Sequence, residues 1–144
     1  AFMVPANLPP PPSGGGGDGE LDALWVPFDE AAIPRLVGEG KTVFVDVTAE
    51  WCITCLVNKT LVLSKGEVFK FLSAGNVVAM QADWTLPDAG ISSYLAGFGR
   101  YGIPFNAVYG PAAPGGVTLP ELLTQGNVLD ALGGASGGAV ATSY

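Results

Sequence analysis

Apolar residues gather into short runs in this chain, and glycine, proline and polar residues separate the runs. Runs rich in β-branched and aromatic residues predict strands, and the longer, mostly apolar ones predict strands buried on both faces of a sheet. The predicted strands cover 24–28 (LWVPF), 42–48 (TVFVDVT), 76–84 (NVVAMQADW), 105–109 (FNAVY) and 117–123 (VTLPELL), with a turn at 110–116 before the last. Pro27 and Pro120 lack the N–H group that a central strand needs, so the first and last strands are expected at sheet edges.

Helical spacing of apolar residues, and the signals that start or stop a helix, fall between these strands. Three sites are placed to cap a helix: Asp29, Thr124, and Ser64 with Glu67, which has the spacing of a capping box. The predicted helices cover 29–37, 52–63, 64–73, 87–99 and 124–132, and residues from Gly133 onward are expected to fray. This order predicts an α/β fold with a central mixed β-sheet flanked by helices on both faces.

Residues 1–20 differ in composition from the rest of the chain. They contain a run of prolines and then a run of glycines (PPPPSGGGG), neither of which can bury apolar surface. The sequence therefore predicts a Pro/Gly-rich linker or tether over 1–20, one domain over 21–133 and a flexible tail over 134–144. An added, non-native tail is the alternative interpretation of the first segment.

Charge and composition exclude several classes of function. The chain of 144 residues carries six basic and thirteen acidic residues, for a net charge of −7. Binding to nucleic acid depends on clustered Lys and Arg, so no nucleic-acid partner is expected. No apolar run reaches the roughly 18 residues that cross a bilayer, so the chain as it stands is expected to be soluble.

The chain has no histidine and only two cysteines. The absence of histidine excludes a Ser–His–Asp triad, a Cys–His protease pair and a histidine metal site. A structural zinc site takes four ligands, mainly Cys and His, so no metal and no bound cofactor are expected. The two cysteines are left as the main candidates for chemistry.

Cys52 and Cys55, separated by two residues, lie at the junction between the predicted strand 42–48 and the next helix. Free N–H groups at a helix N-terminus stabilise a thiolate, which is the nucleophile of disulfide exchange. The spacing places Cys55 one turn below Cys52 and more deeply buried. Cys52 is therefore predicted to attack a partner disulfide, and Cys55 to resolve the mixed disulfide. A static disulfide is the alternative, but so short a loop would add little stability.

Two further features flank the cysteine pair. Asp46 interrupts the apolar strand, where burial would raise its pKa, and it is predicted to exchange a proton with Cys55. A carboxylate that faces solvent at the strand end is the alternative. Ile103–Pro104 precedes the next-to-last strand and predicts a cis peptide bond. Such a bond would aim the Ile103 backbone at a partner chain, which could then pair as an added strand.

The segment 45–55 (VDVTAEWCITC) resembles the thioredoxin superfamily, including its buried acid and its later cis proline. Four blocks in order are similar to the C-terminal domain of DsbD/ScsB-type thiol:disulfide interchange proteins. They are 44–58 (FVDVTAEWCITCLVN), 82–85 (ADWT), 98–104 (FGRYGIP) and 119–124 (LPELLT). The resemblance covers roughly residues 24–132 and implies a thioredoxin fold.

The resemblance also implies a function. The domain would be a thiol–disulfide oxidoreductase that acts as a protein-disulfide reductase. It would accept electrons from a membrane-embedded conducting domain upstream in the same protein and pass them to periplasmic thiol/disulfide proteins. It would lie in the periplasm, tethered to the inner membrane through 1–20. The expected catalytic residues are Cys52, Cys55 and Asp46, and the expected partner-binding residues are Trp51, Ile53, Thr54, Ile103 and Pro104.

Lys59 departs from the family, whose members commonly carry an acid at this position, four residues after the second cysteine. One interpretation is a solvated helix residue. If its side chain instead approaches the site, its charge would favour a thiolate. The family's use of a second carboxylate is therefore not carried over to this chain.

Two other functions remain open from the sequence alone. A free-standing thioredoxin-like oxidase or isomerase would use the same cysteines, but a strong oxidant needs a strongly stabilised reduced form. The residues between the cysteines, Ile53 and Thr54, include no histidine that would help to provide it. A binding module that merely keeps the fold is disfavoured by the intact cysteine pair, Asp46 and Pro104.

Overall fold

The structure, a computed structural model, describes residues 24–137, which fold into strands and helices. The elements are β1 (Trp25–Pro27), α2 (Ala32–Gly38), β2 (Thr42–Thr48), α3 (Ile53–Asn58), the π-helical η1 (Lys59–Leu63), α4 (Gly66–Leu72), β3 (Val77–Asp83), α5 (Ala89–Ala96), β4 (Phe105–Gly110), β5 (Ala113–Thr118) and α6 (Gln125–Ala135). None of the helices within 24–137 has the length and apolar character needed to cross a membrane. The predicted linker 1–20 lies outside the described residues, as do residues 138–144 of the predicted tail.

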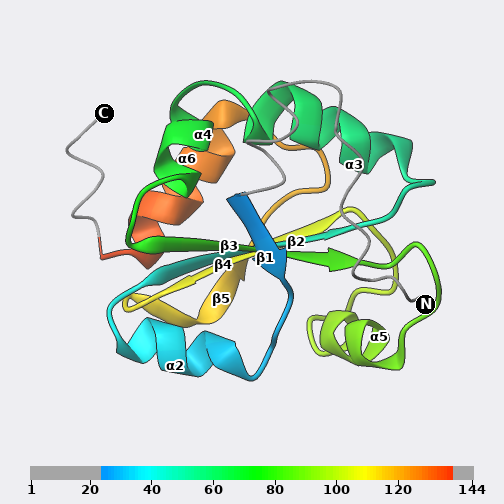
Figure 1. The fold of residues 1–144 in the computed structure, drawn as a ribbon, viewed down its shortest axis with the longest axis horizontal. Coiled ribbons are helices and arrows are strands. Elements are labelled where there is room, and N and C mark those ends of the chain that lie inside the picture. Colours follow the sequence, from blue (N-terminus) through cyan, green and yellow to red (C-terminus); the bar gives the residue numbers. More distant parts are fainter. Residues whose placement is uncertain (1–23, 138–144) are drawn as a thin grey trace, which may run out of the picture.

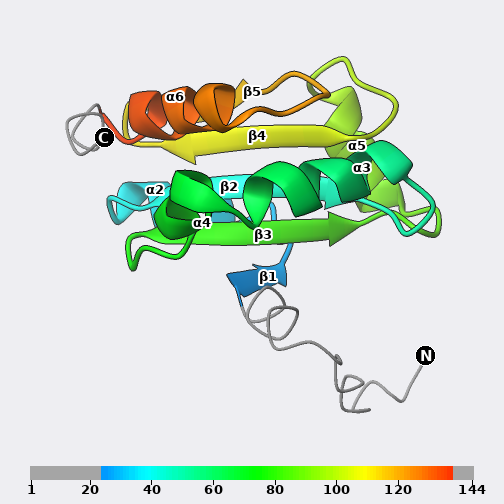
Figure 2. The same cartoon turned by 90° about the horizontal axis from the view of Figure 1, so that it is seen from above.

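The strands of the described region form one five-stranded mixed sheet in the order β1-β3-β2-β4-β5. β1, β3 and β2 run parallel, whereas β4 is antiparallel to both β2 and β5. Figure 1 shows α3, α4 and α6 over one face of the sheet and α2 and α5 over the other, and Figure 2 shows the strands from above. The predicted mixed sheet with helices on both faces is confirmed.

Alternation along β2 decides which side chains meet which layer of helices. Val43, Val45 and Val47 are fully buried in a cluster with residues of α2 and α5. Phe44 points the other way and packs with residues of η1, α4 and α6. Asp46 has the same parity as Phe44, so its side chain lies on the face that α3 covers. The strand pattern thus places the one acidic residue of β2 beneath the helix that carries the cysteines.

The last strand begins earlier than expected. The predicted turn 110–116 is mostly occupied by β5 (Ala113–Thr118), and the predicted strand 117–123 ends at Thr118. Pro114 lies inside β5, which pairs with β4 alone. Since an edge strand tolerates a residue that lacks an N–H group, proline and glycine content did not exclude a strand here.

Thr124 caps the last helix as predicted. Its hydroxyl accepts the Asn127 N–H at 3.0 Å, and the Asn127 side chain accepts the Thr124 N–H at 3.0 Å. The helix α6 nevertheless runs beyond Leu132 to Ala135, and Gly133 and Ala135 are buried. The expected fraying from Gly133 is therefore wrong, because these small residues let the helix end pack closely.

The other two predicted caps are wrong. The helix α2 begins at Ala32 without a side-chain cap, so Asp29 lies before the helix and contributes only its carbonyl to the turn. The Ser64 hydroxyl donates to the Lys59 carbonyl at 2.7 Å, at the end of η1. It therefore completes the preceding helical segment and does not cap α4, which begins at Gly66.

Candidate redox site

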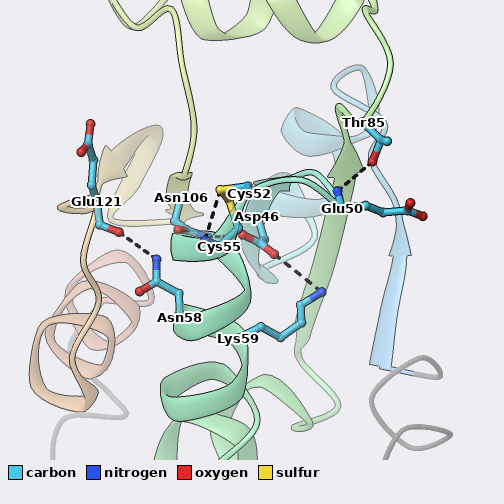
Figure 3. The surroundings of a disulfide bond; sticks show 9 residues. All are labelled: Asp46, Glu50, Cys52, Cys55, Asn58, Lys59, Thr85, Asn106 and Glu121. Carbon is cyan, nitrogen blue, oxygen red and sulfur yellow. Dashed lines mark hydrogen bonds and ion pairs between the residues drawn. A yellow bond between two sulfur atoms is a disulfide. The ribbon is translucent and has the colours of Figure 1, made fainter.

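The Cys52–Cys55 disulfide lies where the chain passes from β2 into α3 (Figure 3). Cys52 is the N-cap of α3, not its first residue, and its Sγ accepts the Cys55 backbone N–H at 3.2 Å. The two Cα atoms are 5.3 Å apart. Both residues are buried, with exposed fractions of 7% for Cys52 and 4% for Cys55. The strand-to-helix junction thus holds both sulfur atoms at the start of the helix.

The loop after β3 holds the residues that lead into the disulfide. The Glu50 backbone N–H donates to Thr85 Oγ1 at 2.9 Å, and the Trp51 indole N–H donates to the Thr85 carbonyl at 3.1 Å (Figure 3 shows the first of these bonds). Asp83 fixes this loop in turn, since its carboxylate accepts the Thr85 N–H at 2.9 Å. Thr85 therefore positions the segment immediately before the first cysteine.

The Ile103–Pro104 peptide bond is cis, as predicted. Pro104 is buried, and Ile103, which is half-buried, packs against the cluster of Ala49, Cys52 and Cys55. The expected position of this segment beside the cysteine pair is confirmed.

Exposed side chains surround the disulfide. Trp51 is 61% exposed and Ile53 is 77% exposed, and Thr54 between the cysteines is exposed as well. Leu56 on α3 and Tyr101 in the loop before β4 are also largely exposed. We call Trp51, Ile53 and Leu56, which adjoin the cysteines in the chain, the apolar rim. Large apolar side chains are costly to leave in water and commonly mark a surface that another chain covers. A partner-binding role for Trp51, Ile53 and Thr54 stays a prediction.

Asp46 is the centre of a polar row that crosses the sheet. In the strand register it lies opposite Gln81 of β3 and Asn106 of β4. The residue is only 4% exposed, and Asn106 Nδ2 donates to Asp46 Oδ1 at 2.8 Å. Burial raises the pKa of Asp46, while the Lys59 charge and the Asn106 hydrogen bond act in the opposite direction. The alternative of a solvent-facing carboxylate at the strand end is wrong.

Lys59, the first residue of η1, extends its side chain from the helical layer to this row. Its Nζ lies 3.8 Å from Asp46 Oδ2, a pair drawn in Figure 3, and also donates to Gln81 Oε1. The same nitrogen lies 4.9 Å from the ring centre of Trp25 in β1. The interpretation of Lys59 as a solvated helix residue is therefore wrong, and its side chain belongs to the site.

Asn58 fixes the far end of α3. Its buried side chain donates to the Glu121 carbonyl at 2.7 Å and accepts the Leu123 N–H at 3.0 Å. These two bonds tie the helix that carries the cysteines to the loop before α6.

The sequence analysis assigned no role to four residues that shape this site. They are Asn58, Gln81, Thr85 and Asn106. Gln81 and Asn106 are polar residues within otherwise apolar runs, which is the signal that singled out Asp46, so they could have been found. Thr85 and Asn58 act through loops whose positions depend on the tertiary structure, and no pattern in the chain points to their partners.

Within residues 24–137, no group of three or more cysteine, aspartate or glutamate residues is arranged to hold a metal ion. The expectations of no metal and no cofactor stay predictions. The chemistry of the two sulfur atoms needs neither.

The five-stranded mixed sheet, its two layers of helices and the disulfide at the strand-to-helix junction define a thioredoxin fold. Residues 25–111, more than half of the chain, match the model of the family described as thioredoxin-like, and the chain belongs to this family. Family and disulfide together define a thiol–disulfide oxidoreductase domain in the general sense. No curated protein matches the chain.

Several solved structures share the fold. The oxidised DsbD C-terminal domain of Neisseria meningitidis is 22% identical, with a TM-score of 0.57, and the match covers 70% of this chain and 87% of that one. A thioredoxin from Thermus thermophilus is 20% identical, with a TM-score of 0.59 and coverages of 82% and 91%. The first thioredoxin domain of mouse protein disulfide-isomerase A4 is 17% identical, with a TM-score of 0.56 and coverages of 87% for both chains.

Proposed function

We propose that this chain is the protein-disulfide reductase domain of a DsbD/ScsB-type thiol:disulfide interchange protein. Four sequence blocks support the proposal because each contributes to one site. The block 44–58 carries the disulfide, and 82–85 holds the segment before it through Thr85. The block 98–104 brings Ile103 against the cysteines, and 119–124 binds the end of α3 through Asn58.

The observation that carries the proposal is the Cys52–Cys55 disulfide beneath the exposed apolar rim. In the reduced domain, the Cys52 thiolate attacks one sulfur of a partner disulfide, and the other partner sulfur leaves as a thiolate. Cys55 then attacks Cys52 Sγ, which closes the domain's own disulfide and releases the second partner sulfur. Two electrons pass to the partner, and its two thiolates take up two protons.

Asp46 serves in this proposal as the proton acceptor for Cys55. It lies on the sheet face that α3 covers, and burial raises its pKa above the ordinary carboxyl value. A raised pKa makes the carboxylate a stronger base for the proton of a thiol. The resolving thiol must lose its proton before it can attack, so this exchange belongs to the second step.

Electrons enter, in this proposal, from a membrane-embedded conducting domain upstream in the same protein. That domain reduces the Cys52–Cys55 disulfide by the same exchange, and the clients are periplasmic thiol/disulfide proteins. Residues 1–20 are the tether to the inner membrane. The disulfide itself carries the electrons, in place of a bound cofactor or metal.

Trapping of mixed disulfides tests the proposal. In the full-length protein in its native compartment, Cys55→Ala leaves Cys52 able to attack but leaves no thiol to release the partner. We expect covalent adducts with periplasmic proteins that dithiothreitol dissolves. The matched control Cys52→Ala is expected to form far fewer adducts, since the attacking sulfur is missing.

The source of electrons needs a second arm. Deletion of the upstream membrane domain should leave the wild-type domain oxidised in cells, as measured by thiol alkylation and gel shift. A domain that stays reduced after the deletion would contradict the electron relay. An absence of adducts in the Cys55→Ala protein would contradict the disulfide exchange itself.

A further inference from the structure

Lys59 has a place in the site that disulfide exchange alone does not explain. We infer that Lys59 is a positioning residue, which holds the Asp46 carboxylate as an anion so that it is ready to take the proton of Cys55. This inference deepens the proposed function and rests on it for the redox step. Lys59 touches neither the partner nor the reacting sulfur atoms in this scheme.

Burial opposes the ionisation of Asp46. The residue lies in the middle of the sheet, between β3 and β4, and almost no water reaches it. Asn106 offers one hydrogen bond to Asp46 Oδ1. Lys59 is the ion-pair partner of Asp46 among the described residues, with Nζ at 3.8 Å from Oδ2. An opposite charge this close favours the charged form of a carboxyl group.

The Lys59 ammonium group is held from three strands. It pairs with Asp46 of β2, donates to Gln81 of β3 and lies over the Trp25 ring of β1. A free lysine side chain has many rotamers, and holding it costs conformational entropy. The ion pair, the hydrogen bond and the cation–π contact together offset that cost. The positive charge therefore stays beside Asp46.

A cleft of about 240 Å³ beside α3 connects this charge to Cys55. Cys55 and Lys59 line it together, with Glu50 from the loop after β2 and Asp83 from the end of β3. Within residues 24–137, these residues of the cleft and Asp46 are the charged and titratable groups beside Lys59. The cleft gives a proton a route between Cys55 and solvent.

The resolving step then balances as follows. The Cys55 S–H proton passes to the Asp46 carboxylate, and the Cys55 thiolate attacks Cys52 Sγ in the mixed disulfide. The Cys52–partner S–S bond breaks, the Cys52–Cys55 bond forms, and the partner sulfur leaves with the electron pair. Asp46 afterwards returns its proton to solvent. Lys59 keeps its own proton throughout.

The variant Lys59→Met tests the inference, because methionine keeps the unbranched stem and removes the charge. Burial raises the pKa of Asp46, and the Lys59 charge lowers it. Without that charge, the carboxyl group should hold its proton to higher pH. Nuclear magnetic resonance titration of the Asp46 carboxyl carbon in the oxidised protein should show an upward shift of the midpoint. Single-turnover resolution of a mixed disulfide should slow about tenfold at pH 7, with its pH profile shifted the same way.

Three variants accompany this test. Lys59→Arg keeps the charge and should restore both the titration and the pH profile. Lys70→Met removes one exposed positive charge from α4, where Lys70 pairs with Glu67 and not with a residue of the polar row, and should change neither. Lys59→Gln repeats the loss of charge with a hydrophilic side chain, should Lys59→Met fail to fold.

The outcomes separate the inference from the proposed function. An Asp46 midpoint that does not move in Lys59→Met and Lys59→Gln overturns the inference. A shifted midpoint with an unchanged pH profile for resolution overturns it as well, because Asp46 would then not be the acceptor. A wild-type protein that exchanges no disulfide would overturn the proposed function. The titration of the oxidised protein needs no turnover, so it still decides whether Lys59 holds Asp46 as a carboxylate.

Discussion

Cys52 and Cys55 differ in their surroundings although both are buried. Cys52 Sγ accepts a backbone N–H at the start of α3, which lowers the energy of a thiolate there. Its sequence neighbours Trp51 and Ile53 are exposed. Cys55 lies inside the helix and against Ile103. The two sulfur atoms are therefore suited to different steps of an exchange.

This difference predicts the order of alkylation. In the reduced protein near pH 7, iodoacetamide should modify Cys52 about tenfold faster than Cys55, because the thiolate reacts and the helix start favours it. Mass spectrometry of the peptides at short reaction times measures the ratio. Faster labelling of Cys55 would reverse the assignment of the attacking and resolving residues.

The burial of Asp46 predicts a gain in stability when its charge is removed. A folded-state pKa above the ordinary value of 3.8 means that the folded protein binds this proton more tightly than the unfolded chain. The stability that protonation contributes is complete below that value and is lost as pH rises through the folded pKa. Asp46→Asn carries no charge, so at neutral pH its free energy of unfolding should exceed that of the wild type, by about 1.4 kcal/mol for each unit by which folding raises the pKa.

Urea denaturation as a function of pH measures this gain. The difference between Asp46→Asn and the wild type should be small at the most acidic values, grow upward from about 3.8 and then level off. The reverse trend, with the variant losing stability as pH rises, would mean that Lys59 and Asn106 outweigh desolvation. The same variant should resolve mixed disulfides more slowly, since it has no proton acceptor for Cys55.

At the scale of elements, the end of α6 packs closely against the end of β4. The Ala135 carbonyl accepts the Ala112 N–H at 2.9 Å, just beyond the end of β4. Gly110 lies against the same carbonyl, so a Cβ atom at this position would collide with the backbone of Ala135. A glycine is therefore required there by space.

Gly110→Ala should destabilise the protein by about 1–3 kcal/mol, because backbone atoms of two elements must move apart. The matched control is Gly38→Ala at the end of α2, where an added Cβ meets nothing within 4 Å. Its effect should stay within about 0.5 kcal/mol. Urea midpoints of the two variants and the wild type provide the comparison, and equal midpoints for Gly110→Ala and the wild type would contradict the close approach.

Strands proved easier to predict than caps. The run 42–48 is apolar enough that few alternatives to a buried strand exist, and β2 has these same bounds. A cap depends on which backbone groups still lack a hydrogen-bond partner. The Ser64 hydroxyl bonds to the Lys59 carbonyl of η1 and therefore does not cap α4. The segment 113–118 is rich in proline and glycine and forms a strand only because β4 offers it an edge. The composition of a segment does not show which strand will lie beside it.

At the scale of the whole molecule, the site is assembled from segments far apart in the chain. The cysteine pair, Asp46 and Pro104 could be predicted because each has a local signal. Gln81 and Asn106 could be singled out as polar residues in apolar runs, but their alignment with Asp46 in one row depends on the register of three strands. The reach of Lys59 into that row depends on how α3 lies over the sheet. Sequence therefore indicated the reacting groups, and the structure was needed for the residues that tune them.

The last prediction concerns the direction of electron flow. A relay must be reducing enough to reduce its clients and oxidising enough to accept electrons from its donor. Potentials of such proteins run from about −270 mV for thioredoxin to about −120 mV for a strong oxidant, whose reduced form is strongly stabilised. Here a backbone N–H stabilises the Cys52 sulfur, and the residues between the cysteines, Ile53 and Thr54, carry no charge. We therefore expect a reduction potential in the reducing half of that range.

Titration of the isolated chain against glutathione or dithiothreitol should show one two-electron step, because the sequence has one cysteine pair. A potential near that of the strong oxidant would contradict the reductase and favour an oxidase.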